Sequence, residues 1–412
     1  MSAESFDALE RRDPEAREAA LLARLPDQIA HAQRNSAYFA SLLKGIDPSG
    51  IASRAALATL PVTRKGDLIG LQKKAPPFGG LNATPPAGLA RIFMSPGPIY
   101  DLEAHGADYW RFGRALFAAG FRRGDIVHNC FSYHLTPAGS MIETAAHALG
   151  CAVVPAGTGQ TELQLRAIAD IRPSGYAGTP SFLKILFEKA AEASVDISCL
   201  KKALVSGEAL PPSLRAELEG QGCTVTQSYA TADLGLIAYE TEAREGLILD
   251  EGVIVEILRP GTGDPVPDGD VGEVVVTVFS PDYPLIRFGT GDMSAVMAGT
   301  SPCGRTNRRI KGWMGRADQT TKVKGMFVHP GQIAELAKRH TALGRVRLVV
   351  SGETGQDVML LKAEAPAGDD ALAGRIAETL QALTKLKGQV ELVPPGSLPN
   401  DGKLIEDARS YA

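Results

Sequence analysis

The chain has 412 residues, enough for two or three domains of roughly 150 residues each. Its 44% hydrophobic and 22% charged residues are typical of a globular protein and exclude a mainly disordered or fibrous chain. The 43 basic and 47 acidic residues leave a net charge of −4, so nucleic acid and acidic membranes are not expected as partners, and a small molecule is. The 44 glycines exceed the usual share of about 7%, which indicates many turns or close approaches of the backbone to a ligand.

Five widely spaced cysteines without a Cys-x-x-Cys pair argue against a disulfide framework or a zinc ribbon. The N-terminal stretch is acidic and has no apolar core of a signal peptide, and no run approaches 18 apolar residues. We therefore expect a cytoplasmic protein with reduced thiols and no membrane span.

The N-terminal part begins with a helix signal. Asp13 and Pro14 predict the start of an amphipathic helix that continues to Ile29, and a short helix is expected at 38–43. The proline-rich segment that follows is expected to be mostly irregular, apart from a helix near 54–60.

From residue 109 the helix and strand patterns alternate. Helices are expected at 109–119, 140–149, 162–171, 180–192 and 212–220, and strands at 126–130, 151–155, 174–177, 203–206 and 223–227. This alternation predicts β-α-β units and a parallel sheet covered by helices on both faces. Ligands bind at the carboxyl ends of the strands in such sheets, so the loops there are candidate site segments.

The pattern changes after residue 240. Strands at 253–258 and 273–279, joined by turns rich in proline and glycine, predict a hairpin-rich β subdomain at about 240–315. The segments 322–328 (strand), 330–338 (helix), two further strands, 369–386 (helix) and 390–393 (strand) predict a small α+β module. The predicted fold class is α/β: a large N-terminal domain (1–317) of parallel sheets covered by helices with the β subdomain, then a small mobile α+β C-terminal domain (318–412).

Four polar segments stand in loops of this scheme. The loop after strand 223–227 reads SYATADLG and sets an aromatic residue, Tyr229, four positions before Asp233, an arrangement suited to base stacking and metal contact. Asp292 ends the turn PLIRFGTGD, which suits two ribose hydroxyls. The segments GRAD (315–318) and LPNDGK (398–403) complete the set.

In the order of these segments the sequence resembles the adenylate-forming (AMP-binding) ligases, and within them the phenylacetate-CoA ligase branch, over nearly the whole chain. The resemblance implies that ATP and Mg2+ activate a carboxylic acid to an acyl-adenylate, whose acyl group then passes to coenzyme A, and it suggests a homodimer. It implies that Tyr229 stacks on adenine, Asp292 binds the ribose hydroxyls and Arg316 contacts ribose or phosphate. Asp318 resembles the hinge of the small domain, and Lys403 the lysine that enters the site during adenylation.

Further positions match the family's site. Gly325 resembles the glycine that lines the thiol tunnel, and Asp233 stands where the family has a glutamate for magnesium. Tyr133 and His134 lie near the expected acyl pocket, which suggests an aryl or arylacetic acid. The resemblance also assigns residues to the nucleotide (Ser95, Gly97, Gly207, Glu208) and to the acid (Gly178, Ala230).

The family's phosphate loop, rich in Ser, Thr and Gly and ending in lysine, is replaced here by MSPGPIYD (94–101). Pro96 and Pro98 have no N–H to offer a phosphate, and no lysine follows. Three interpretations remain. The chain is a working ligase whose phosphates are held by other groups, a non-enzymatic descendant that binds an acyl group or nucleotide, or an acyl transferase that needs no ATP. We favour the first because the other motif residues are retained.

Two possible metal sites have simpler explanations. His128, Cys130 and His134 resemble a metal trio, but the first two lie in an expected buried strand, where packing is their expected role. Some relatives carry a structural zinc near the segment that matches Cys303, yet Pro302 stands here in place of a neighbouring cysteine, so no zinc is expected.

Overall fold

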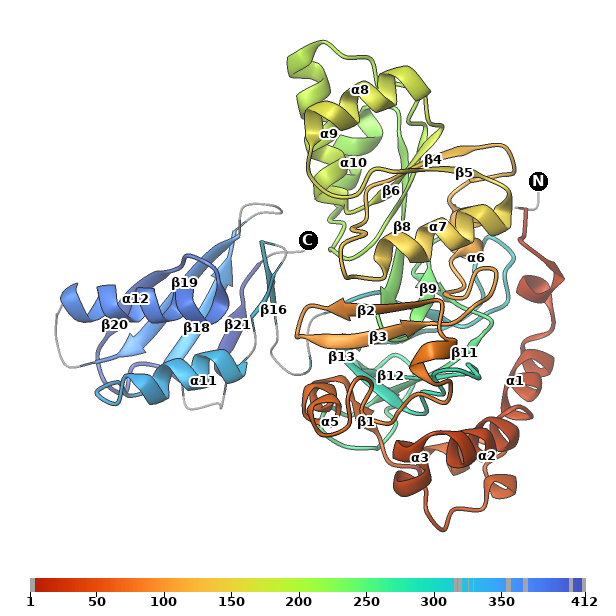
Figure 1. Cartoon of the computed structure of the whole chain (residues 1–412), viewed down its shortest axis with the longest axis horizontal. Coiled ribbons are helices and arrows are strands. Elements are labelled where there is room, and N and C mark those ends of the chain that lie inside the picture. Colours follow the sequence, from red (N-terminus) through yellow and green to blue (C-terminus); the bar gives the residue numbers. More distant parts are fainter. Residues whose placement is uncertain are drawn as a thin grey trace. The chain divides into compact units, whose positions relative to one another are not determined.

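The computed structural model describes residues 4–314, 317, 321–324, 326–328, 330–352, 357–365, 370–399 and 403–409. The chain divides into two compact units, Met1–Gly315 and Arg316–Ala412. Each unit has its own hydrophobic core, and both are drawn in Figure 1. The predicted α/β class, with a larger N-terminal part and a smaller C-terminal part, is confirmed.

A nine-stranded sheet forms the centre of the large unit, in the order β14-β15-β10-β9-β8-β7-β6-β4-β5. One half is parallel: β5 (Ala152–Pro155), β4 (Ile126–Asn129), β6 (Gly175–Gly178), β7 (Lys202–Val205) and β8 (Thr224–Thr231). The other half is antiparallel: β9 (Gly235–Tyr239), β10 (Leu247–Leu249), β15 (Arg309–Ile310) and β14 (Val296–Met297). The predicted parallel strands are therefore present, in one continuous sheet with part of the antiparallel region.

Helices cover both faces of the parallel half (Figure 1). On one face lie α6 (Gly113–Ala118) and α7 (Ala138–Leu149), and on the other α8 (Thr161–Ile171), α9 (Pro180–Ala193) and α10 (Pro212–Gly220). Successive strand residues point to opposite faces. Accordingly Ala177 and Leu204 belong to the first core, whereas Tyr176 and Ala203 belong to the second.

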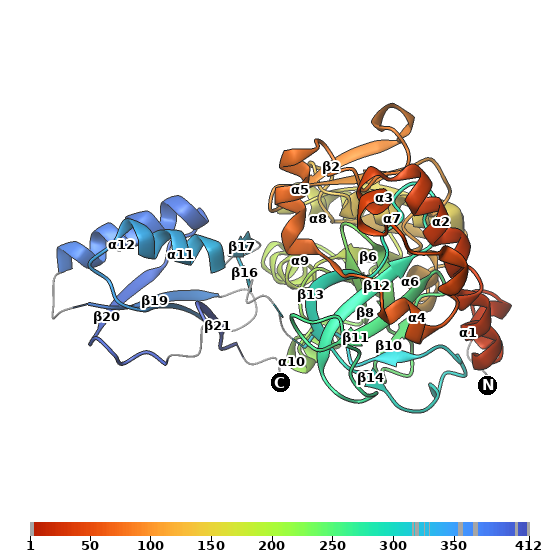
Figure 2. The same ribbon diagram turned by 90° about the horizontal axis from the view of Figure 1, so that it is seen from below.

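A second sheet has the order β1-β13-β12-β11. Its strands are β1 (Thr63–Arg64), β13 (Phe288–Ser294), β12 (Gly272–Val278) and β11 (Val253–Leu258). The N-terminal helices pack on it in one core: α1 (Pro14–Leu22), α2 (Leu25–Asn35), α3 (Ala37–Leu42) and α4 (Arg54–Ala58). In Figure 2, α4 lies beside β11, and Arg54 donates a hydrogen bond of 2.9 Å to the Val255 carbonyl oxygen.

The N-terminal segment differs from its prediction in two ways. Asp13 caps the first helix by accepting a hydrogen bond of 2.9 Å from the Ala16 N–H, but this helix ends at Leu22 and a new one begins at Leu25. Pro26 lies in the first turn of α2, a position that tolerates proline. The segment expected to be irregular contains the helix α5 (Leu68–Lys74) and the antiparallel hairpin of β2 (Arg91–Ser95) and β3 (Ile99–Glu103).

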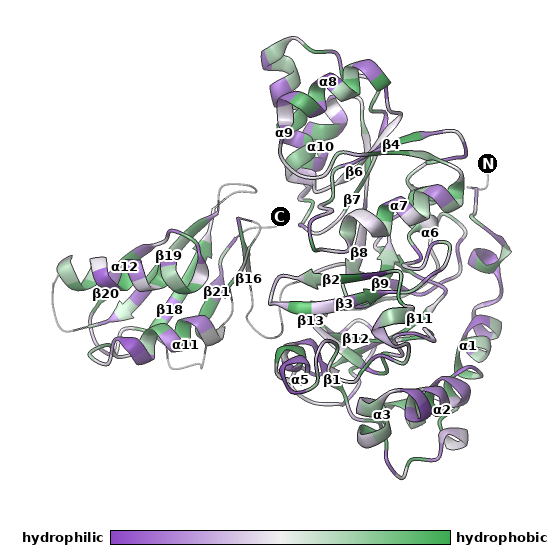
Figure 3. Cartoon of the chain, in the orientation of Figure 1, coloured by the Kyte–Doolittle hydropathy of each residue, from purple (hydrophilic) through white to green (hydrophobic). Residues whose placement is uncertain are grey.

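The small unit contains a four-stranded sheet in the order β20-β19-β18-β21, with α11 (Pro330–Arg339) and α12 (Asp370–Thr384) packed against each other. The strands are β18 (Val346–Ser351), β19 (Val358–Glu364), β20 (Gln389–Val393) and β21 (Ile405–Asp407). The strand expected at 322–328 is instead two paired strands, β16 (Thr321–Val323) and β17 (Met326–Val328). In Figure 3, α9 of the large unit and α11 both carry hydrophilic and hydrophobic residues along their length, as amphipathic helices do.

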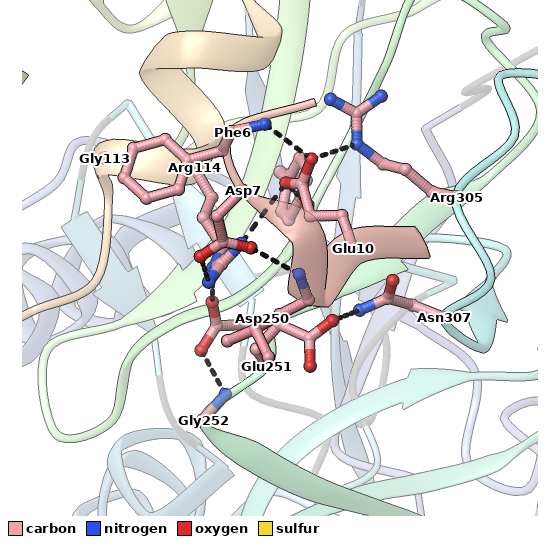
Figure 4. Close-up of polar contacts among 12 residues, drawn as sticks. Phe6, Asp7, Glu10, Gly113, Arg114, Asp250, Glu251, Gly252, Arg305 and Asn307 are labelled. Carbon is pink, nitrogen blue, oxygen red and sulfur yellow. Dashed lines mark hydrogen bonds and ion pairs between the residues drawn. The ribbon is translucent and has the colours of Figure 1, made fainter. Parts of the chain in front are cut away.

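A buried polar network around Glu10 connects the N-terminal segment with the rest of the large unit (Figure 4). The carboxylate of Glu10, which is 0% exposed, accepts hydrogen bonds from Arg305 Nε at 2.9 Å, Tyr239 Oη at 2.6 Å and the Phe6 N–H at 2.9 Å. Arg305 is itself 1% exposed. In the part of the chain that the structure describes, no helix is both long and apolar enough to cross a membrane.

Candidate active site

The carboxyl ends of β4, β6, β7 and β8 meet at one edge of the parallel sheet, where ligands bind in folds of this kind. The loops that follow these strands are tied to one another. Ser181 Oγ, after β6, donates a hydrogen bond of 2.6 Å to Glu208 after β7, and Ser206 Oγ donates one of 2.8 Å to the Ser228 carbonyl oxygen in β8. Gly207, between Ser206 and Glu208, has a φ of 80°, a conformation that favours glycine.

Tyr229 and Asp292 are brought together from two different sheets. Tyr229 lies within β8 rather than in a loop after it, because β8 continues to Thr231 and pairs with β9. Its hydroxyl donates a hydrogen bond of 2.9 Å to Asp292 Oδ2, in β13, and lies 3.2 Å from Thr290 Oγ1. Asp292 is 8% exposed, so its carboxylate is held in a mostly buried position.

Trp313 also contacts this carboxylate and was missed by the sequence reasoning. Its Nε1–H donates a hydrogen bond of 3.1 Å to Asp292 Oδ1, while 36% of the residue is exposed. Both oxygens of Asp292 therefore accept a hydrogen bond from an aromatic side chain. The available signal was that one of the chain's two tryptophans lies two positions before Gly315, where the GRAD segment begins.

The segment expected in place of a phosphate loop is the hairpin β2-β3. Ser95 pairs with Ile99, so Pro96, Gly97 and Pro98 form the whole turn. Gly97 is the only residue of this turn with a backbone N–H. The Ser95 side chain is buried and donates a hydrogen bond of 3.3 Å to the Ile99 carbonyl oxygen. Neither Ser95 nor the turn thus presents the row of donors that a phosphate cradle requires.

Beneath this hairpin lies a carboxylate pair with a lysine. Lys65 Nζ, in the 3-10 helix Lys65–Asp67, is 2.5 Å from Asp233 Oδ2. Asp101, in β3, is completely buried beside Asp233. Burial and then the neighbouring Asp233 carboxylate raise the pKa of Asp101 well above its usual value. Asp101 was not proposed from its residue type, because one aspartate in a proline-rich segment carries no distinctive signal.

Several oxygen atoms of this cluster lack hydrogen-bond partners within the described residues: both carboxylate oxygens of Asp101, Asp233 Oδ1 and the Tyr283 hydroxyl. Magnesium prefers oxygen ligands and is usually held by one or two carboxylates together with water and phosphate oxygens. The donor set of Asp101 and Asp233 therefore fits this ion. Among the described residues no cluster of three or more His, Cys, Asp or Glu forms a complete cage, so other oxygens would have to complete the coordination.

The residues expected around the acid lie in or beside the β4 loop. Tyr133 is 37% exposed; its hydroxyl donates to Glu143 Oε2 and accepts from Asn129 Nδ2, both at 2.8 Å. Burial of the hydroxyl, with the bond to Glu143, raises the pKa of Tyr133. The ring is thus held as a fixed wall. His134 is exposed in the same loop, and its backbone N–H donates to Ser132 Oγ at 3.1 Å.

Two other residues assigned to the acid are engaged in internal packing. A Cβ atom on Gly178 would lie 2.2 Å from Tyr176 Oη, and Ala230 packs against the core under α6 and α7. Within the described residues, His128 and Cys130 belong to no group of side chains that could hold a metal ion. Both instead contact Gln164 Oε1, His128 Nε2 at 2.9 Å and Cys130 Sγ at 3.2 Å.

The C-terminal candidates all belong to the small unit, Arg316–Ala412. Lys403 is exposed just before β21. Arg316, Asp318 and Gly325 lie outside the described residues.

Comparison with known proteins gives a consistent result. A family model described as "AMP-binding enzyme" matches residues 106–278. The chain is 31% identical over 422 residues to a phenylacetate-coenzyme A ligase of Thermus thermophilus, covering 92% of this chain and 94% of the relative. It is 29% identical over 398 residues to that of Aromatoleum evansii, covering 92% and 88%. A crystal structure of a 2-hydroxyisobutyryl-CoA ligase with 2-HIB-AMP and CoA superposes with a TM-score of 0.83 at 25% identity, covering 98% of this chain and 92% of that one.

Proposed function

Since the chain belongs to the AMP-binding enzyme family, in the branch of the phenylacetate-coenzyme A ligases, we propose that it is an AMP-forming ligase that activates a carboxylic acid with ATP and transfers the acyl group to coenzyme A. The observation that carries this proposal is the hydrogen bond between Tyr229 and Asp292. Two residues expected at one nucleoside, 63 positions apart, lie side by side next to the carboxyl edge of the parallel sheet.

In this proposal the adenosine part of ATP binds at β8 and β13. The ring of Tyr229 stacks on adenine, and the Asp292 carboxylate accepts hydrogen bonds from the ribose hydroxyls. A carboxylate accepts hydrogen bonds through both of its oxygens, which suits the two hydroxyls of a ribose. Gly207 and Glu208 follow β7 on the same edge and line the nucleotide.

The chemical step joins two anions, the substrate carboxylate and the α-phosphate. A positioned cation that meets the developing charge lowers this barrier, because the interaction is strongest in the transition state. We assign this role to Lys403, a compact charge on a long side chain. Arg316 is assigned to ribose or phosphate contact, Asp318 to a hinge of the small domain, and Gly325 to the thiol tunnel. Such a rotation would remove the lysine before the thiol of coenzyme A attacks the same carbonyl.

A magnesium ion bound near Asp233 would withdraw charge from the phosphate oxygens and orient them. Asp233 Oδ1 suits this ion because it is a buried carboxylate oxygen without a hydrogen-bond donor in the described part of the chain. Lys65, at 2.5 Å from Oδ2, fixes the orientation of the same carboxylate. In this proposal Asp233 supplies an oxygen to the magnesium ion, and Lys65 keeps that carboxylate in place.

For the acid we propose an aryl or arylacetic acid, because the exposed ring of Tyr133 and the neighbouring His134 offer an aromatic wall after β4. The similar crystal structure contains the adenylate of a small hydroxy acid, so the panel of candidate acids should include aliphatic ones. We also propose that the protein acts in the cytoplasm as a homodimer. Light scattering on the purified protein tests the oligomeric state.

The function is tested by incubating the purified chain with ATP, Mg2+, coenzyme A and single acids from an aryl and aliphatic panel. We expect AMP and the acyl-CoA in equal amounts with at least one acid. Pyrophosphate exchange should occur with the same acid and fail in Lys403→Ala. Acyl-CoA formation without ATP, or no product with any acid although nucleotide binds, would contradict the proposal.

A further inference from the structure

Asp101 enters the interior from β3, on the hairpin that stands in place of a phosphate loop. On the hairpin, Ile92 and Tyr100 are exposed, whereas Phe93 and its cross-strand partner Asp101 are buried; toward the end of β3 both faces are covered, since Leu102 and Glu103 are buried as well. Since side chains alternate along a strand, Asp101 belongs to the inward face. Its position is therefore set by the hairpin itself and not by a flexible loop.

The inward side chains include two carboxylates with different surroundings. Glu103 accepts hydrogen bonds from Trp110 Nε1 at 2.9 Å and Ser140 Oγ at 2.6 Å and forms an ion pair with Arg91. Asp101 has no such partner in the described residues, although it is 0% exposed. The nearby Ser95 hydroxyl donates instead to the Ile99 carbonyl oxygen. A buried carboxylate without donors is costly, so Asp101 either keeps a proton that it shares with the neighbouring Asp233 or is ionised next to a cation.

The same place contains two further groups of this kind. Asp233 Oδ1 is buried and without a hydrogen-bond partner in the described part of the chain, and so is the hydroxyl of Tyr283, which is 2% exposed. Both carboxylates lie close enough to Tyr283 to raise the pKa of its hydroxyl, after the larger effect of burial. With both carboxylates ionised, three carboxylate oxygens and one hydroxyl thus lie in one buried site without a hydrogen-bond partner among the described residues.

From this arrangement we infer that Asp101 and Asp233 jointly hold a divalent cation, which supplies the positive charge that the hairpin turn cannot. The identification of the ion as the magnesium of an ATP-dependent reaction rests on the proposed function. Two carboxylates, completed by water and phosphate oxygens, form a usual magnesium site. Asp101 is then a metal ligand supplied by the hairpin that replaces the phosphate loop.

Charge balance supports this assignment. With both carboxylates ionised, Asp101, Asp233 and Lys65 carry a total of −1, which repels a triphosphate. A bound divalent cation changes the total to +1, which attracts it. A phosphate loop achieves the same result with backbone N–H groups and a lysine. Here the turn offers one N–H, from Gly97, so the cation has to carry a larger part of the charge compensation.

The test is a titration of the full-length protein with Mn2+, a spectroscopic substitute for Mg2+, in which electron paramagnetic resonance measures the free ion. Wild type is expected to bind one Mn2+ in the absence of nucleotide, in competition with Mg2+. Asp101→Asn and Asp233→Asn should each weaken binding by at least about tenfold. The matched control is Asp108→Asn, which changes another mostly buried carboxylate of the large unit and should bind Mn2+ as wild type does.

Folding is checked by thermal unfolding without metal. Asp101→Asn should unfold at the same temperature as wild type or higher, because it removes a buried charge next to Asp233. Mg2+ should raise the unfolding temperature of wild type and of Asp108→Asn but not that of Asp101→Asn. The inference is overturned if wild type binds no Mn2+, as it would if the two carboxylates simply share a proton. It is also overturned if Asp101→Asn binds Mn2+ with the affinity of wild type.

The outcome is independent of the ligase assay. If no acid is activated but Mn2+ binding depends on Asp101, the metal site stands and the proposed function fails. If acyl-CoA forms and Mn2+ binding is indifferent to Asp101, the function stands and the inference fails.

Discussion

The hydroxyl of Tyr229 and the carboxylate of Asp292 form a hydrogen bond of 2.9 Å. This bond connects β8 of the nine-stranded sheet with β13 of the sheet β1-β13-β12-β11. Trp313 holds the other oxygen of Asp292 at 3.1 Å. Tyr229 and Asp292 both lie on strands, so the carboxylate of Asp292 is fixed in position before a ligand arrives. A site arranged in this way loses little further freedom when a nucleotide binds.

The first prediction concerns this pair. Tyr229→Phe keeps the ring but removes the hydrogen bond that orients Asp292, an effect of at most about 1 kcal/mol, so the KM for ATP should rise by up to about fivefold. Asp292→Ala removes the acceptor of the ribose hydroxyls and should raise it by more than about tenfold. Steady-state kinetics with varied ATP measures both. Tyr38→Phe, which removes a tyrosine hydroxyl 3.2 Å from Thr63 Oγ1, is the control and should leave the KM unchanged. Unchanged KM values in both site variants would show that ATP binds elsewhere.

The second prediction separates the two half-reactions. Lys403→Ala should slow formation of the acyl-adenylate by at least about a hundredfold, because it removes a cation placed at the developing charge. Conversion of a supplied acyl-adenylate to the acyl-CoA should change little. Single-turnover assays of each step measure this difference. Lys387→Ala, an exposed lysine of the same unit, should match wild type in both assays. Equal slowing of both steps would refute the assigned role.

The parallel strands and their helices could be predicted from sequence because they depend on local signals. Strand residues such as Val205 and Tyr176 are apolar and fully buried, and helices such as α9 begin at a capping residue, Thr179. The hairpin β2-β3 was missed because its inward positions include Ser95 and Asp101, so its alternation is not a hydrophobic one. A search for hydrophobic periodicity cannot detect such a strand.

The candidate site was predictable only in part for a related reason. Tyr229 and Asp292 were found through motifs, yet the strand β8 continues past its apolar part into polar residues, where a loop was expected. The contact between Lys65 and Asp233 joins residues 168 positions apart. Nothing local specifies that pairing, or the burial of Asp101 beside it, because both bring together segments that are far apart in the sequence.

The third prediction concerns the N-terminal network of Figure 4. Glu10→Gln removes the buried carboxylate 2.9 Å from Arg305 and leaves this buried cation with the more distant Glu242, at 3.8 Å, so the free energy of unfolding should fall by about 3 kcal/mol. Urea denaturation measures the loss. Lys189→Ala, which removes an exposed ion pair with Glu192, should change it by less than about 0.5 kcal/mol. Because Glu10 lies outside the candidate site, the KM for ATP should not change. A stability loss equal to that of the control would show that the buried pair contributes little.

The fourth prediction is a pH dependence that arises from Asp108. Burial, with a smaller contribution from the nearby Asp250, raises the pKa of Asp108 from 3.8 to about 6, while the Gly113 N–H donates to its Oδ2 at 2.9 Å. Between these pH values the folded state binds more protons than the unfolded state, so the contribution of Asp108 to stability falls as the pH rises through this window and stays low above it.

Asp108→Asn removes this titration and keeps an acceptor for the Gly113 N–H. The variant should therefore gain stability relative to wild type as the pH rises from about 4 to about 6, and the gain should then remain constant. Urea unfolding of both proteins at about pH 4.5 and about pH 7.5 measures the difference. A larger gain at the higher pH supports the raised pKa. A gain that is the same at both pH values, or a loss at the higher one, would mean that Asp108 is ionised in the folded protein throughout this range.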